Sequence, residues 1–158
     1  MTVNADIWRK VRYNIVEVRL AMGIVEKAEV FATKMHKGQV DKAGRPYIEH
    51  PRAVASMVDG EKEKVVAWLH DVVEDTDATI EQIREMFGDE IADAVATMTH
   101  DKSVPYMDYV RGVKKNAIAR KVKMADLSHN MDLSRLPNVT DADLERVEKY
   151  KKAYEILK

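Results

Sequence analysis

The sequence predicts an all-α protein, a helical bundle of roughly eight or nine helices. Apolar residues recur every three or four positions in one segment after another, which is the period of a helix buried on one face. No stretch alternates apolar and polar residues as a half-buried strand would, and no internal repeat is visible. The length of 158 residues fits a single domain, 1–158, and leaves no room for a second catalytic domain.

The expected helices follow one another, separated by glycine, proline and capping residues. They are 7–22, 24–37, a short helix that begins at 51 and includes 54 and 58, 61–74, 79–87, 90–98, one that begins at 105 and includes 113, 117–135, and one that ends at 157. Gly38 suits the left-handed conformation that commonly ends a helix. Asp77 or Thr79 is expected to cap the helix at 79–87, and Thr140 or Asp141 the last helix.

The segment 38–51 is the longest predicted loop, because two glycines and two prolines interrupt any helical period there. Long loops in compact domains often carry function. His50 stands at the end of this loop, just before Pro51. We therefore expect the loop to contribute to a functional site.

The composition excludes several classes of function. Lys and Arg number 26 against 27 Asp and Glu, so the chain lacks the basic excess that a nucleic-acid-polymer binder needs. The absence of cysteine excludes disulfides, zinc–thiolate sites and thiol nucleophiles. The first residues do not resemble a signal peptide, and no apolar run approaches the roughly 18 residues that span a bilayer. We expect a cytoplasmic protein with no membrane partner.

An acidic, histidine-containing cluster lies inside the apolar helix predicted at 61–74. His70 and Glu74 are one turn apart, and so are Asp71 and Asp75, so one imidazole and three carboxylates share one region. Charged side chains are rarely buried unless they are paired or bind a metal. Imidazole and carboxylate without thiolate favour manganese, magnesium or iron, and zinc is allowed. Taken alone, His70-Asp71 could be an ordinary buried polar pair, and Glu74-Asp75 could simply end a helix before Thr76.

Two ligands on one helix cannot complete a metal shell, so further ligands must come from elsewhere in the chain. His50 is one candidate. Asp126 is another, because it lies mid-helix among apolar residues. Asn130 follows four residues later on the same helix face, where it could hold a substrate or a metal-bound water.

The motifs around these residues resemble one family of enzymes. The order His50, His70-Asp71, Asp126 matches the H…HD…D signature of the HD superfamily of phosphohydrolases. The segments 44–51, 69–76 and 123–131 resemble the hydrolase domain of RelA/SpoT enzymes and the stand-alone small alarmone hydrolases. These enzymes remove pyrophosphate from the 3′ position of guanosine tetra- and pentaphosphate, usually with manganese. The resemblance spans residues 24–135.

The resemblance implies roles for individual residues. His50, His70, Asp71 and Asp126 would bind the metal, and the Glu74-Asp75 pair would handle the attacking metal-bound water. Asn130 matches the family's asparagine near the nucleoside. Lys42 is a basic residue of the loop that, in the family, contacts the substrate. Lys102 lies in a segment that resembles a polar stretch near the pocket, with a turn before Pro105 as the equal alternative.

Two positions depart from the family pattern. Asp41 stands where the family commonly has arginine, and an acid cannot stack or donate as a guanidinium does. The simplest interpretation of Asp41 is a solvated loop residue. Leu127 stands where a basic residue usually follows the aspartate. The substrate could therefore be another nucleotide, such as an adenosine alarmone, a nucleoside monophosphate or a phosphorylated dinucleotide, and a non-catalytic nucleotide-binding module is a further alternative.

Two other histidines have simpler explanations. His36 lies at a helix end, where dipole compensation explains it as well as substrate binding does. His129 projects about 100° away from Asn130 and is interpreted as structural. The expected partner is a small-molecule nucleotide, and the apolar stripes on the first and last helices are compatible with a homo-oligomer.

Overall fold

The computed structural model describes residues 22–158, and its regular elements are helices, as predicted. They are α2 (Ile24–Met35), α3 (Glu49–Ser56), α4 (Glu61–Leu69), α5 (Val72–Asp75), α6 (Ile80–Phe87), α7 (Asp89–Met98), α8 (Tyr106–Val113), α9 (Ala117–Met131), the 3₁₀ helix η1 (Leu133–Arg135) and α10 (Asp141–Leu157). A single β-bridge joins Val40 and Pro46 in the loop between α2 and α3. The helix predicted at 7–22 lies outside the described residues.

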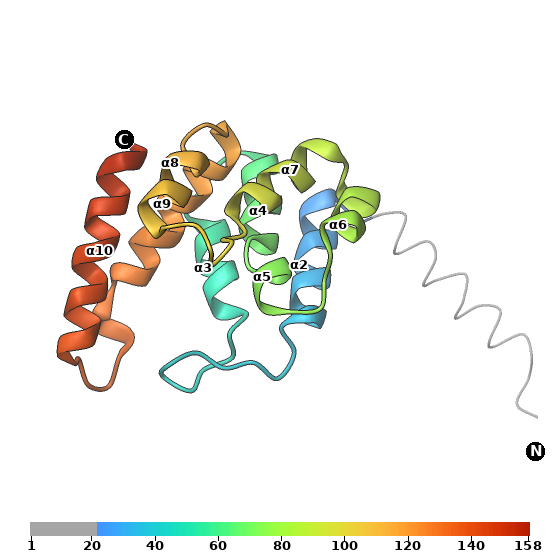
Figure 1. The fold of residues 1–158 in the computed structure, drawn as a ribbon. Helices are drawn as coiled ribbons and strands as arrows, with labels where there is room; N and C mark the ends of the chain where they lie inside the picture. The colour runs from blue at the N-terminus through green and yellow to red at the C-terminus, as the bar shows by residue number, and fades with distance from the viewer. Residues whose placement is uncertain (1–21) are drawn as a thin grey trace, which may run out of the picture.

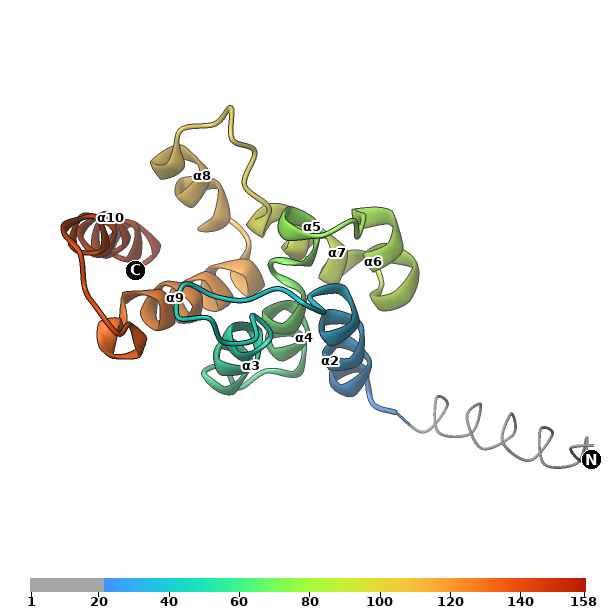
Figure 2. The same ribbon diagram turned by 90° about the horizontal axis from the view of Figure 1, so that it is seen from below.

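Helix α4 is the centre of the fold. It packs against α2, α3, α7 and α9, while α10 covers α8 and α9 from one end of the molecule (Figures 1 and 2). The side chains of Val65, Val66 and Leu69 on α4 have no exposed surface. Apolar burial of this extent is the main stabilising contribution to such a bundle. The start of α3, the end of α4 and the body of α9 are thereby held close together.

The helix predicted at 61–74 is broken at its most polar point. Helix α4 ends at Leu69 and α5 begins at Val72, so His70 and Asp71 lie at the break. Neighbouring residues of a continuous helix project about 100° apart and cannot face one point. The break removes this constraint, and Nε2 of His70 lies 2.9 Å from Oδ2 of Asp71. One helical hydrogen bond survives, from the Asp75 amide to the Asp71 carbonyl at 2.9 Å.

The short helix near Pro51 also differs from its prediction. Helix α3 begins at Glu49 and ends at Ser56, short of Val58. Proline is tolerated in the first turn, because the amide it lacks would have had no helical partner there. His50 is therefore in the first turn of a helix and is not a loop residue.

Capping residues explain most other boundaries. Thr79 and Thr140 each form a capping box with the third residue of the following helix. Gly38 has a φ of +85°, the left-handed conformation predicted for it. Helix α9 ends at Met131, earlier than predicted, because the Asp132 side chain accepts a hydrogen bond from the Ser134 amide and starts η1. No helix among residues 22–158 is long and apolar enough to cross a membrane.

Candidate metal and nucleotide site

Three residues from separate segments of the chain bring their donor atoms together. Nε2 of His50 on α3 lies 3.0 Å from Oδ1 of Asp126 on α9 and 3.3 Å from Nε2 of His70. Suitable donor atoms of all three residues lie within 4.8 Å of one another. The three residues are at most 6% exposed. Buried charged groups this close together are the arrangement that a bound cation would stabilise.

Asp71 adds a carboxylate at the edge of this cluster. Its Oδ2 lies 3.7 Å from Nε2 of His50 as well as beside His70. The Tyr47 hydroxyl donates a hydrogen bond to the same oxygen. Burial, followed by the charge of Asp71, raises the pKa of Tyr47, so its hydroxyl keeps the proton that it donates. All four predicted metal ligands are thus close together, although their ligand role remains a prediction.

Hydrogen bonds orient both imidazoles toward the cluster. Nδ1 of His70 lies 2.7 Å from the Ala67 carbonyl oxygen and must donate to it, which leaves the Nε2 lone pair for a cation. Nδ1 of His50 lies 2.7 Å from Nδ1 of His129. If His50 is to present an Nε2 lone pair, its Nδ1 must donate and His129 must accept. Burial, and then the neighbouring His50, lower the pKa of His129 to about 4, so His129 is neutral and can accept.

Asp126 is ionised despite its burial. Burial alone would raise the pKa of its carboxyl, but Lys123 and the two histidines lower it well below its usual value. Nζ of Lys123 lies 2.8 Å from Oδ2, and the Asn130 amide donates to Oδ1 at 2.7 Å. Two imidazole nitrogens with carboxylate oxygens fit a divalent cation of intermediate or hard character. The residues present therefore fit the metal that the sequence predicts.

The two predicted catalytic carboxylates differ in their surroundings. Glu74 uses both oxygens, accepting from the His100 amide at 2.7 Å and from Nζ of Lys102 at 3.1 Å. No such partner holds the Asp75 carboxylate among residues 22–158. Burial, and then the charges of Asp71 and Glu74, raise the pKa of Asp75. A carboxylate with a raised pKa is the better proton acceptor near neutral pH.

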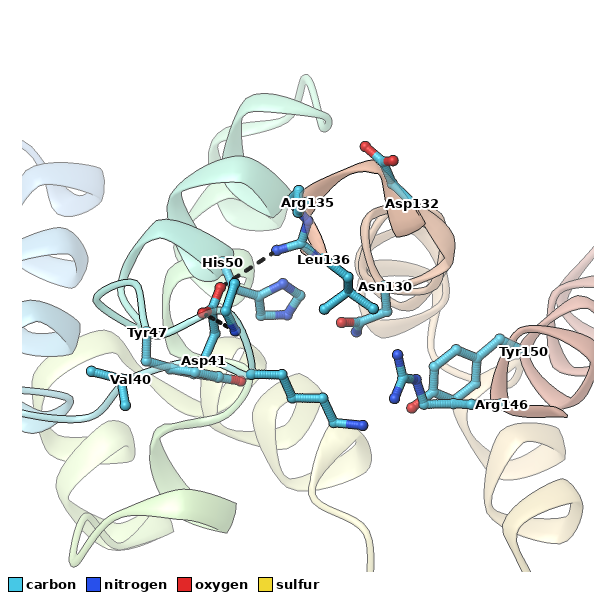
Figure 3. A pocket seen from close by; sticks show the side chains of 12 residues that line it. Val40, Asp41, Tyr47, His50, Asn130, Asp132, Arg135, Leu136, Arg146 and Tyr150 are labelled. Atoms are coloured by element: carbon cyan, nitrogen blue, oxygen red, sulfur yellow. Dashed lines mark hydrogen bonds and ion pairs between the residues drawn. The ribbon is translucent and has the colours of Figure 1, made fainter. Parts of the chain in front are cut away.

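Two adjoining cavities meet at the cluster. The first, of about 460 Å³, contains the cluster residues Asp71 and Asp126 and the Glu74-Asp75 pair, and we call it the metal cavity. The second, of about 300 Å³, lies beside the 38–47 loop, and we call it the loop cavity (Figure 3). Tyr47, Asn130 and Tyr150 line both cavities. A molecule with a phosphorylated end and a nucleoside end could occupy both at once.

Asp41, the residue of the loop cavity that departs from the family pattern, has specific contacts. Oδ1 of Asp41 accepts hydrogen bonds from the amides of Ala43 and Arg45, at 2.8 and 3.0 Å, and so folds the loop into a tight turn. Its Oδ2 lies 3.9 Å from Nη1 of Arg135, which points toward it across the cavity (Figure 3). The interpretation of Asp41 as a solvated loop residue is therefore wrong, because both oxygens have partners.

The other residues that were predicted to bind the substrate line one or both cavities. Lys42 lines the loop cavity, with Nζ 3.7 Å from Oδ1 of Asp143 on α10. Asn130 lies between the cavities, bonded to Asp126. Lys102 lines the metal cavity beside Glu74. Their contact with a substrate remains a prediction.

Comparison with known proteins identifies the family. The family profile described as the HD domain matches residues 28–133. The chain belongs to the HD-domain family. The histidine–aspartate pair at the break between α4 and α5 lies within the matched range.

Relatives of this HD domain include enzymes of alarmone metabolism. The human protein described as guanosine-3′,5′-bis(diphosphate) 3′-pyrophosphohydrolase MESH1 is 36% identical over 129 residues, which are 73% of this chain and 72% of that protein. A GTP pyrophosphokinase of Myxococcus xanthus is 32% identical over 70% of this chain, but the chain spans only 17% of that protein's length. A solved structure described as a metazoan orthologue of SpoT that hydrolyses ppGpp aligns with a TM-score of 0.70 at 27% identity, covering 87% of this chain and 86% of that one.

Several residues of this HD-domain site were not predicted from the sequence. They are Tyr47, Tyr106, Lys123, His129, Arg135, Arg146, Lys149 and Tyr150. Arg146 and Tyr150 are one turn apart on α10, and this spacing is the signal that could have found them. Lys123 lies three residues before Asp126, a helical ion-pair spacing. The contact between His129 and His50 joins residues 79 positions apart and has no local signal.

Proposed function

We propose that this HD-domain protein is a metal-dependent hydrolase of nucleotides that removes pyrophosphate from the 3′ position of a guanosine tetraphosphate-like alarmone. The observation that carries the proposal is the cluster of His50, His70 and Asp126 beside the metal cavity, whose donor atoms lie within 4.8 Å of one another. A proton-accepting carboxylate, Asp75, lines the same cavity. The activity stated in the name of the human relative supports the choice of substrate.

The metal in this proposal is a divalent ion, most simply manganese, held by His50, His70, Asp71 and Asp126. When bound, such an ion offsets the charge of a phosphoryl oxygen and lowers the pKa of a coordinated water. The protein keeps the donors ready: Ala67 and His129 hold the imidazole tautomers, and Lys123 keeps Asp126 ionised.

Asp75 and Glu74 have different roles in the proposed reaction. Asp75 accepts the proton of the water that attacks the 3′ phosphorus, because its raised pKa suits it to hold that proton. The bond from this phosphorus to the 3′ oxygen breaks, and the 3′ oxygen takes up a proton as pyrophosphate departs. Glu74 fixes the ammonium of Lys102 in the same cavity, where it can meet a phosphate oxygen.

The nucleoside would lie in the loop cavity. Tyr150 and Tyr47 offer apolar faces, and Asn130 offers an amide between the two cavities. Asp41 and Arg135 together form a polar edge that differs from a simple basic loop. This edge favours a second candidate, in which the same chemistry acts on a nucleotide with another base, such as an adenosine alarmone.

The test is turnover of a nucleotide panel by the purified protein with manganese. The panel contains guanosine and adenosine 3′-diphosphates, a nucleoside monophosphate and a phosphorylated dinucleotide. Asp71→Ala should abolish turnover and weaken manganese binding while circular dichroism shows retained helix content. Arg84→Met, which removes only two exposed ion pairs, is the matched control. Wild-type turnover in the Asp71→Ala variant would refute the metal mechanism, and strong preference for another base would select the second candidate.

A further inference from the structure

Three lysines line the metal cavity, and one of them differs from the other two. Nζ of Lys102 lies 3.1 Å from Glu74, and Nζ of Lys123 lies 2.8 Å from Asp126. Lys149, on α10, makes no ion pair with any carboxylate of residues 22–158. Its charge is therefore the one lysine charge of this cavity, within that part of the chain, that no acidic side chain offsets.

Lys149 is exposed, but it does not make the local ion pair that a surface lysine on a helix commonly makes. Glu145 lies one turn earlier on α10, the spacing at which a glutamate and a lysine commonly pair on a helix. On the same helix, Lys151 makes such a local pair with Glu148 at 2.6 Å. Lys149 instead places Nζ 4.5 Å from the ring centroid of Tyr106 and 5.5 Å from that of Tyr150.

The two tyrosine rings position the ammonium without neutralising it. An aromatic face attracts a cation through its quadrupole, yet it accepts no conventional hydrogen bond. The N–H donors of Lys149 thus remain available, at the wall of the cavity that also contains Asp71, Asp126 and Lys102. A polyanion is the ligand chemistry that fits such a site.

We propose that Lys149 binds the outer phosphate of the 3′-diphosphate, the one beyond the phosphorus that is attacked. It then selects a nucleoside diphosphate over a monophosphate and holds the departing pyrophosphate. This assignment rests on the proposed function. Lys102 and Lys149 bind the diphosphate together, while Asp71 and Asp126 hold the metal, Asp75 accepts the proton of the water and Glu74 fixes Lys102.

The experiment compares Lys149→Met with wild type on guanosine 3′-diphosphate and guanosine 3′-monophosphate. We expect kcat/KM for the diphosphate to fall about 10–100-fold, the factor that one charged hydrogen bond supplies, and to fall much less for the monophosphate. The inhibition constant of inorganic pyrophosphate should rise by a similar factor. Lys149→Arg should recover most of both effects. The matched control is Lys151→Met, which removes a lysine of the same helix outside the metal cavity.

The outcomes separate this inference from the proposed function. Equal losses on both substrates, or no recovery by arginine, would mean that Lys149 only packs against the tyrosines and would overturn the assignment. If wild type hydrolyses none of these nucleotides, the proposed function fails. Calorimetric titration of the manganese-loaded protein with inorganic pyrophosphate then still decides: weaker binding by Lys149→Met supports the site, and unchanged binding overturns it.

Discussion

The two cavities of this HD domain are built in different ways. Beside the metal cavity, the donor atoms of His50, His70 and Asp126 are buried and lie 3.0–3.7 Å apart, and α3, α4 and α9 hold them by packing against each other. Around the loop cavity, the ion pairs of Asp41 and Lys42 span 3.9 and 3.7 Å and lie partly in solvent. The helical core thus determines the reaction chemistry, whereas the substrate edge depends on one loop and a few surface charges that can change without disturbing the core.

Beyond the proposed metal ligands, the largest effect should come from Asp75, the proposed proton acceptor. Asp75→Asn removes the proton acceptor and should lower kcat by about 10²–10⁴-fold. Because the pKa of Asp75 is raised, wild-type activity should fall as pH decreases through a value above that of an ordinary carboxyl, and the variant should lose this acid limb. Steady-state rates measured across pH test both points.

The same substitution, Asp75→Asn, should lower activity but raise the stability of the fold. A folded-state pKa above the unfolded value means that the charged form of Asp75 destabilises the fold at neutral pH. Asp75→Asn should therefore raise the melting temperature at pH 7, and the gain should vanish below the pKa of an unfolded aspartate. A variant that keeps full activity, or that melts earlier than wild type at pH 7, would contradict this assignment.

A smaller effect is expected at His129, which contacts the proposed metal ligand His50. His129→Leu removes the acceptor that faces Nδ1 of His50, so His50 loses its orientation. Manganese affinity should fall about 10–100-fold, as measured by calorimetry. His129→Asn can place an amide oxygen near the position of the lost nitrogen and should recover much of the affinity. Equal metal affinity in wild type and the leucine variant would show that packing alone orients His50.

The smallest effect should come from the loop cavity. Asp41→Asn keeps an oxygen for the turn but removes the negative charge 3.9 Å from Arg135. The KM for a polyanionic nucleotide should fall by less than about tenfold, with kcat unchanged, because a partly exposed ion pair 3.9 Å long contributes only about 0–1 kcal/mol. Asp41→Ala is the comparison variant, since it also loses the turn. A large drop in kcat for Asp41→Asn would show that the two cavities are not separable.

The difference between the cavities also explains what the sequence could predict. His70-Asp71 and Asp126 stand out because polar residues in apolar helical segments need a partner, and this physical signal is local. The helix break between Leu69 and Val72 was not predicted, because the two side chains must face one point and the apolar period alone does not record that requirement. The residues of α10 escaped prediction because their place in the site follows from the packing of α10 on α8 and α9.

The role of Asp41 could not be inferred from its residue type. Aspartate is common both in solvated loops and in side-chain-capped turns, and only the hydrogen bonds to the Ala43 and Arg45 amides distinguish them. Its partner Arg135 lies 94 positions away in a 3₁₀ helix that was predicted as the end of a longer helix. Contacts between distant loops have no periodic signature in the sequence.

The guanidinium of Arg135 contacts both the loop cavity and the residue that lies beside His50. Nη1 faces Asp41 of the loop, and Nη2 donates to the carbonyl oxygen of His129 at 3.1 Å, the residue whose ring contacts His50. A nucleotide that draws Arg135 toward itself would alter the surroundings of the proposed metal ligand His50. Thermodynamic reciprocity then requires that the metal change nucleotide affinity by the same factor that the nucleotide changes metal affinity. Binding of the metal and binding of the nucleotide would then be coupled, so that the occupancy of the site depends on both concentrations.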